Sequence, residues 1–74
     1  MERYVNYLNA LTKFAQLAGE YSFAEQYGPD KSNLNSLKKE LKKRARILLK
    51  EYQAIPDEVK VPELLEKIDK ALNL

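Results

Sequence analysis

The chain has 74 residues, of which 45% are hydrophobic and 32% are charged, and its formal net charge at pH 7 is +2. This balance predicts one small globular domain over residues 1–74 and argues against a disordered chain. The absence of cysteine and histidine excludes disulfides, thiolate zinc sites, cysteine-dependent catalysis and the usual general base at neutral pH. Because no catalytic constellation or glycine-rich phosphate loop is visible either, we expect no enzymatic activity, no metal site and no cofactor.

The first predicted helix, 2–18, is apolar over more than half of its circumference. At about 100° per residue, its polar side chains share one narrow stripe. The remaining surface carries two apolar lines, Tyr4, Leu8, Leu11, Ala15 and Ala18 in one, and Tyr7, Phe14 and Tyr21 in the other. Such a helix must contact several neighbours, so we expect it to be either the central helix of a bundle or half of an oligomer interface.

Gly19 is expected to end or kink this first helix, because glycine favours helix ends. The residues that follow, Ser22-Phe23-Ala24-Glu25, have the S-x-x-E form of a capping box and predict a short helix over 22–27. A single helix that runs unbroken to Tyr27 is the alternative.

Two partial resemblances cover the same region. Residues 14–19 resemble the first helix and turn of a helix-turn-helix motif, and residues 19–24 resemble the turn and second-helix start of a tetratricopeptide unit. The first resemblance fails where Glu25 and Gly28 stand in place of buried apolar residues, and no repeat of about 34 residues supports the second. Both imply a helix, a turn near Gly19 and another helix.

The next predicted helix, 32–54, has clear boundary signals. Glycine and proline at 28–29 break the chain before it, Ser32 is suited to be its N-cap, and Pro56 disfavours helix beyond Ile55. Its apolar side chains fall in a stripe about 80° wide, as expected for a helix that buries one face. They are Leu34, Leu37, Leu41, Ala45, Leu48, Tyr52 and Ile55.

This helix also carries most of the positive charge of the chain. Residues 31–50 hold eight basic and one acidic side chain, whereas both flanking segments have more acidic than basic ones. Lys38 and Arg44 lie at the margins of the apolar stripe, where their aliphatic stems could cover its edges. The other basic residues that we single out fall within about 60° of one another on the side opposite the leucines. These are Lys39, Lys43, Arg46 and Lys50.

The exposed basic stripe has three interpretations. It spans about 16 Å and could contact several phosphates, which predicts sequence-nonspecific, salt-dependent nucleic-acid binding. It lacks amide or aromatic side chains for base readout. An anionic membrane surface would also attract it, although core packing explains the leucine pattern more simply. The third interpretation is that the acidic segments on either side balance the charge within the fold.

The last predicted helix, 62–72, begins with proline in its first turn, and glutamate–lysine pairs four residues apart support it. Its acidic residues Glu63, Glu66 and Asp69 are expected to be a solvated face rather than a metal site. Together the elements predict an all-α fold, an up-and-down bundle of three to four helices over about 2–18, 22–27, 32–54 and 62–72.

The favoured functional interpretation is a non-enzymatic protein-interaction module that could associate with itself through the first helix. Large apolar residues beyond the needs of a one-sided helix carry this hypothesis, because aromatic side chains are effective interface anchors. The candidates are Tyr7, Phe14, Leu17, Tyr21 and, among the charges of the basic helix, Ile47. The alternatives are that these residues form the core of a small bundle, or that the chain is a designed bundle without a natural partner.

Localisation is predicted from segments that the sequence lacks. Its longest apolar run, 47–49, is far shorter than the roughly 20 residues of a membrane span, and its first residues do not resemble a secretory signal. We therefore expect a soluble, cytoplasmic protein.

Overall fold

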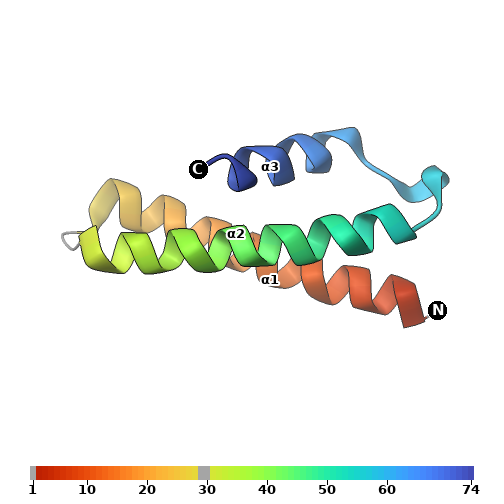
Figure 1. The fold of residues 1–74 in the computed structure, drawn as a ribbon, viewed down its shortest axis with the longest axis horizontal. Coiled ribbons are helices and arrows are strands. Elements are labelled where there is room, and N and C mark those ends of the chain that lie inside the picture. The colour runs from red at the N-terminus through yellow and green to blue at the C-terminus, as the bar shows by residue number, and fades with distance from the viewer. Residues whose placement is uncertain (1, 29–30) are drawn as a thin grey trace.

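The computed structural model describes the backbone of residues 2–28 and 31–74 and the side chains of residues 4–28 and 33–74. Over this part of the chain the protein has three α-helices, α1 (Glu2–Tyr27), α2 (Lys31–Ala54) and α3 (Pro62–Leu72), with a short 3-10 helix, η1 (Asp57–Val59), before α3 (Figure 1). No strand occurs in the same residues. The predicted small all-α bundle is confirmed, with three α-helices.

Helix α1 continues unbroken through Gly19 to Tyr27. The predicted end at Gly19 and the separate helix 22–27 are therefore wrong, and the single-helix alternative is correct. A glycine in a helix costs only about 0.5–1 kcal/mol, which packing along α2 can offset over a helix of 26 residues. The turn implied by the two partial resemblances is likewise absent at Gly19.

Helix α2 begins at Lys31, one residue before the Ser32 that the sequence suggested as its N-cap. Ser32 is thus inside the helix, and the residues that immediately precede α2 lie outside the described part of the chain. The predicted apolar stripe is the buried face of α2: Leu34 and Leu37 are half-buried and the other five stripe residues are buried. The stripe is the surface on which α1 and α3 pack.

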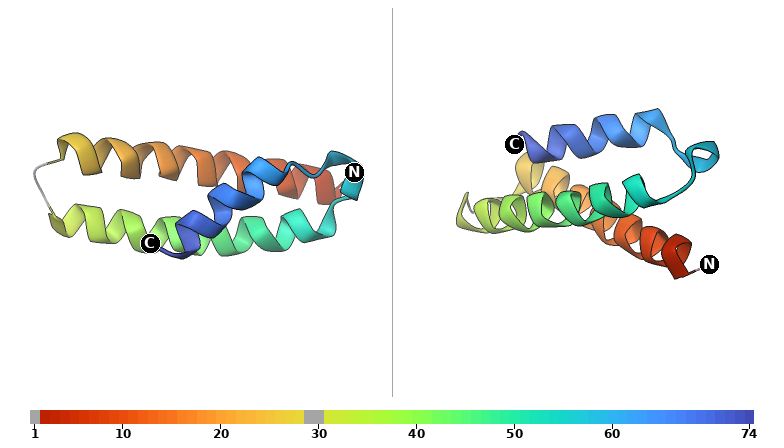
Figure 2. Two further views of the ribbon diagram at one scale, coloured as in Figure 1. Left: turned by 90° about the horizontal axis from the view of Figure 1, so that it is seen from above. Right: turned by 45° about the vertical axis from the view of Figure 1, so that its right-hand side comes forward.

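Helices α1 and α2 form an antiparallel pair, and α3 crosses over α2 on one side of it (Figure 2). Both α1 and α3 pack on α2, but among the described residues no Cα atom of α3 lies within 8 Å of one in α1. Helix α2 is therefore the central helix, whereas the sequence suggested this role for the first one. With 11 residues, α3 is less than half as long as either neighbour, so it covers only part of the pair.

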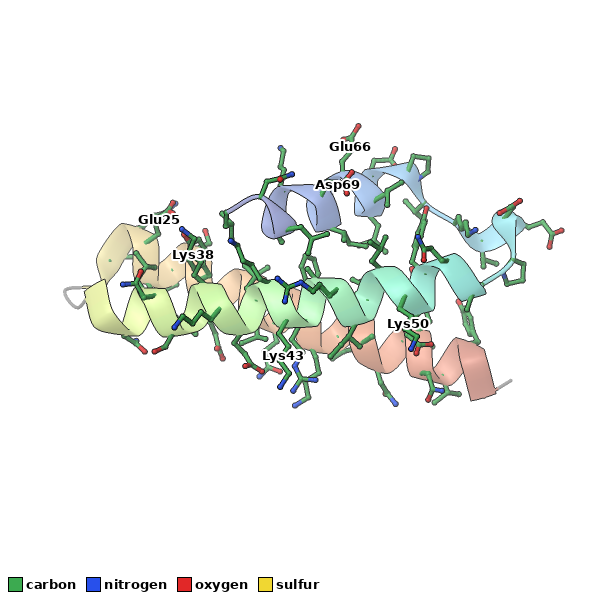
Figure 3. All side chains as sticks on the ribbon, in the orientation of Figure 1. Glu25, Lys38, Lys43, Lys50, Glu66 and Asp69 are labelled. Carbon is green, nitrogen blue, oxygen red and sulfur yellow. The ribbon has the colours of Figure 1, made fainter. Side chains whose placement is uncertain are left out.

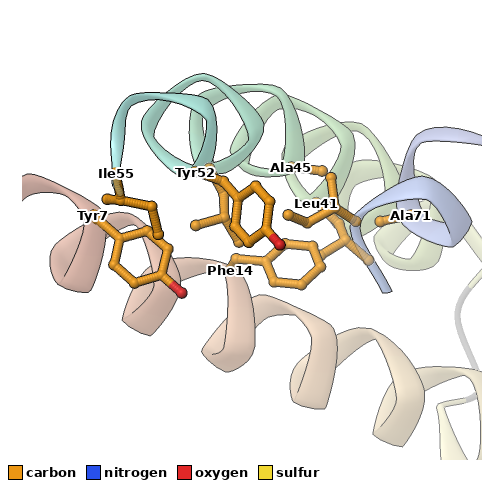
Figure 4. Packing of buried hydrophobic residues seen from close by; sticks show 9 residues of the cluster. Tyr7, Phe14, Leu41, Ala45, Tyr52, Ile55 and Ala71 are labelled. Atoms are coloured by element: carbon orange, nitrogen blue, oxygen red, sulfur yellow. The ribbon is translucent and has the colours of Figure 1, made fainter. Parts of the chain in front are cut away.

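The core lies where the three helices meet along α2. Leu48 of α2 and Ile68 of α3 are fully buried, and burying a side chain of this size contributes roughly 1.5–3 kcal/mol to stability. Figure 4 shows how the residues of the cluster pack. Its buried members are Tyr7, Phe14, Leu41, Ala45, Leu48, Tyr52, Ile55, Ile68 and Ala71.

Candidate functional site

The predicted interface residues of α1 divide between the core and its edge. Tyr7 and Phe14 are only 5% and 4% exposed and point from α1 toward α2 in the core (Figure 4). Leu17 and Tyr21 are half-buried and pack against the same cluster. Tyr7 and Phe14 therefore already have partners within the chain, and a second molecule could reach them only if α1 separated from α2.

The environment of Tyr7 is aromatic as well as buried. Its ring centroid lies 6.0 Å from that of Tyr4 and 6.5 Å from that of Tyr52. Burial raises the pKa of the Tyr7 phenol above 10.0, and the neighbouring phenols of Tyr4 and Tyr52 raise it further. Tyr7 thus favours its neutral form and acts as a core residue that joins α1 to α2.

The other apolar line of α1 is the more accessible one. Tyr4, Leu8 and Ala15 are exposed, and Leu11 and Ala18 are half-buried. This division follows from the position of α3, which lies over α2 and leaves one side of α1 without a helix packed against it. The accessible apolar surface of α1 is therefore not the line that carries most of the interface candidates.

A groove of about 450 Å³ opens between α1 and α3. Ala18 and Tyr21 line it from α1, Leu41 from α2 and Ala71 from α3. Two lysines of α3, Lys67 and Lys70, also line it, and because both are exposed they form a basic rim. We call this site the α1/α3 groove; it has an apolar floor and a positively charged edge.

Tyr21 lies where the α1/α3 groove approaches the end of α1. Burial raises the pKa of its phenol above 10.0, and the charge of the Glu25 carboxylate and a hydrogen bond to it raise the pKa further. The hydroxyl donates in this hydrogen bond, since the carboxylate can only accept. Tyr21 therefore presents an apolar ring to the groove while its hydroxyl is held by Glu25.

The four residues of the basic stripe, Lys39, Lys43, Arg46 and Lys50, are all exposed, as the helical spacing predicted. Lys43 and Lys50 point away from α3 (Figure 3). The marginal residues Lys38 and Arg44 are half-buried. Arg44 Nε lies 3.3 Å from Glu40 Oε1 in the same helix, so one of the marginal charges is balanced within α2.

A second, polar depression of about 650 Å³ lies between α1 and α2. Its α1 side contains Asn6, Asn9, Lys13 and Gln16, and its α2 side contains Arg44 and the interface candidate Ile47. Ile47 is 39% exposed and sits beside amide groups rather than on an apolar surface. The amide donors that are missing from the basic helix are thus supplied next to it by α1.

Sequence reasoning missed both depressions, for different reasons. The polar depression depends on which residues of α1 lie opposite Arg44 and Ile47, and helical periodicity does not give the register between two helices. The α1/α3 groove had a usable signal in the lengths of the elements, because a helix of 11 residues cannot cover two of 26 and 24.

Residues 62–72 and the rest of the described chain contain no group of three or more acidic side chains placed to hold a metal ion. Within the described residues, none of the helices has an apolar stretch of the length that crossing a membrane requires. Comparison with protein-family models, with curated proteins and with solved structures gave no match.

Proposed function

We propose that this protein is a non-enzymatic interaction module that binds an amphipathic helix of a protein partner in the α1/α3 groove. The observation that carries the proposal is that α1 and α3 both pack on α2 without packing on each other. In a four-helix bundle, the space beside such an arrangement is filled by a further helix. Binding of one amphipathic helix between two others is a common mode of peptide recognition.

The chemistry of the groove defines the partner helix. Its floor of alanine, leucine and aromatic side chains would receive the apolar face of that helix, and Tyr21 is the type of residue that anchors interfaces. Lys67 and Lys70 at the rim favour acidic residues along the edge of the partner. We therefore expect the groove to prefer a helix with leucine on one face and glutamate beside it.

Two synthetic peptides of equal length and helical spacing test this proposal, one built from Leu and Glu and one from Leu and Lys. In a titration followed by amide chemical shifts, the Leu/Glu peptide is expected to shift residues 14–22 and 67–74. The Leu/Lys peptide should bind at least about tenfold more weakly, a difference of about 1.4 kcal/mol. The proposal is wrong if neither peptide shifts these residues at millimolar concentration.

The K67E/K70E variant is the control for charge in this titration. Both side chains are exposed, so reversing them should leave helicity unchanged. The variant is expected to lose its preference for the acidic peptide, because the rim would then repel it. An unchanged preference would show that the peptide binds elsewhere.

Sequence-nonspecific nucleic-acid binding is a second candidate, and the polar depression is the observation that favours it. Asn6, Asn9 and Gln16 lie in the same depression as Arg44 and Lys13, so amide donors adjoin the basic face of α2. Amide side chains can donate to phosphates and to base edges. The expected affinity is electrostatic and falls steeply with added salt.

Anisotropy of a labelled DNA duplex tests this second candidate. Replacing the four stripe residues together with glutamine should weaken binding at about 50 mM salt by more than tenfold. The matched control replaces Lys60, Lys67 and Lys70 with glutamine and should have a much smaller effect, since these lysines lie outside the basic stripe. Absence of binding by the unmodified protein at this salt concentration would eliminate the candidate.

A further inference from the structure

The C-terminal end of α1 carries an exposed aromatic pair. Phe23 and Tyr27 are 66% and 70% exposed, the largest exposures among the large hydrophobic side chains of the described residues. Their ring centroids lie 5.1 Å apart at an interplanar angle of 47°. Two aromatic rings held together on a helix surface form a preassembled apolar anchor, because they would bury a large area at a low cost in side-chain entropy.

The aromatic pair shares its side of α1 with an acidic residue. At about 100° per residue, Glu20, Phe23 and Tyr27 fall within about 60° of one another, at positions i, i+3 and i+7. This spacing is the one by which a helix presents anchors to a groove. We call these three residues the α1 tip.

We propose that the α1 tip of one molecule occupies the α1/α3 groove of a second copy of this chain. The inference rests on the proposed function and names the partner helix. Charge complementarity supports the pairing: residues 14–28 carry only acidic charges, Glu20 and Glu25, whereas the groove rim carries Lys67 and Lys70. Such charges contribute little energy at an exposed rim but determine which surfaces meet.

The dimensions of the two surfaces agree as well. From residue 20 to residue 27 the α1 tip extends about 10 Å along the helix axis. The part of α1 that lines the groove, from Phe14 to Ser22, extends about 12 Å. The tip is therefore long enough to place both aromatic rings along the groove floor.

The tip and the groove lie on opposite sides of α1. Phe23 is about 140° from Ala18 and about 160° from Tyr21 around the helix axis. A molecule therefore cannot fill its groove with its own tip, and the contact between two molecules joins different surfaces. Such a head-to-tail contact leaves a free tip and a free groove at the two ends, so it forms rings or filaments rather than a closed symmetric dimer.

Two variants with one damaged surface each test this arrangement by complementation. The tip variant is F23S/Y27S and the rim variant is K67E/K70E; all four side chains are exposed, and unchanged helicity by circular dichroism verifies the fold. In sedimentation velocity, the unmodified protein is expected to form species that grow with concentration. Each variant alone should sediment as a monomer.

An equimolar mixture of the two variants is expected to form a heterodimer and nothing larger. The intact groove of the tip variant can receive the intact tip of the rim variant, and the remaining surfaces are both damaged. The inference is overturned if the unmodified protein is monomeric at about millimolar concentration, if either variant associates as the unmodified protein does, or if the mixture stays monomeric.

The peptide titration separates failure of this inference from failure of the proposed function. Binding of the Leu/Glu peptide in the groove without heterodimer formation would leave the proposed function standing and reject a second copy as the partner. Failure of both experiments would reject both proposals.

Discussion

The hydroxyl of Tyr52 donates a hydrogen bond of 3.2 Å to the backbone carbonyl of Val61. Val61 is the N-cap residue of α3, and its carbonyl also accepts the N–H groups of Leu64 at 3.0 Å and Leu65 at 3.4 Å. One side chain near the end of α2 therefore holds the carbonyl from which α3 begins. Because α3 packs on α2 alone, this bond is part of what fixes the position of α3.

Replacing Tyr52 with phenylalanine should destabilise the protein by about 0.5–1.5 kcal/mol, the usual contribution of one hydrogen bond. Native-state hydrogen exchange should show the loss mainly in residues 64–72, because the ring can remain in the core while α3 loses its anchor. Equal loss of protection in α1 and α3 would contradict this interpretation.

The two glycines should respond in opposite directions to alanine. A Cβ atom on Gly19 would have no heavy atom outside its own turn within 4 Å, so Gly19→Ala should stabilise the protein by about 0.5–1 kcal/mol through helix propensity. A Cβ atom on Gly28 would lie 2.5 Å from the carbonyl oxygen of Ala24, which accepts the Gly28 N–H at 2.8 Å.

Gly28→Ala should therefore destabilise the protein, by roughly 1 kcal/mol or more. Urea denaturation of both variants is the measurement. A destabilising Gly19→Ala would indicate that the glycine is required for something other than the packing of the monomer.

Neighbouring residues of α2 should differ sharply in their contribution to stability. Leu48 is 0% exposed and Ile47 is 39% exposed. Leu48→Ala should cost about 2–5 kcal/mol because it opens a cavity in the core. Ile47→Ala should cost less than about 1 kcal/mol, because alanine has the higher helix propensity and little buried area is lost. Thermal unfolding of the two variants compares them directly, and similar losses would place Ile47 in the core.

Stability should fall at alkaline pH in a way that depends on Tyr7. Its pKa is raised in the folded state, mainly by burial, so the neutral phenol contributes stability that is complete below pH 10 and is lost as the pH rises through the folded pKa. Between pH 9 and pH 11, urea denaturation should show a larger loss of stability for the unmodified protein than for Tyr7→Phe. The titrations that the two proteins share cancel in this comparison, and equal losses would contradict the assignment.

The sequence predicts most of the fold because its signals are local. The apolar stripe from Leu34 to Ile55 marks the buried face of α2, and proline at 62 starts α3 where expected. Gly19 was misread because the cost of one helical glycine is small compared with the packing of a long helix. Local rules register that cost but not the packing that offsets it.

The candidate site was less predictable, because it depends on relations between helices. The aromatic content of α1 indicated contacts with neighbours, but only the structure separates buried Phe14 from exposed Phe23. The alternative of a bundle core applies to Tyr7 and Phe14, whereas the α1/α3 groove arises from the short α3 and its placement over α2. Neither the crossing of α3 nor the register of α1 against α2 is encoded in a periodicity that can be read along one helix.

Each α-helix of this protein packs only on the next one in the chain, α1 on α2 and α2 on α3. No helix packing joins the two ends of the chain, so folding need not close a loop across the whole molecule. Topologies dominated by such sequence-near contacts fold in microseconds to milliseconds. We therefore expect this protein to fold on that timescale, with the α1–α2 turn and the Ala54–Pro62 connection as the only chain reversals that must form.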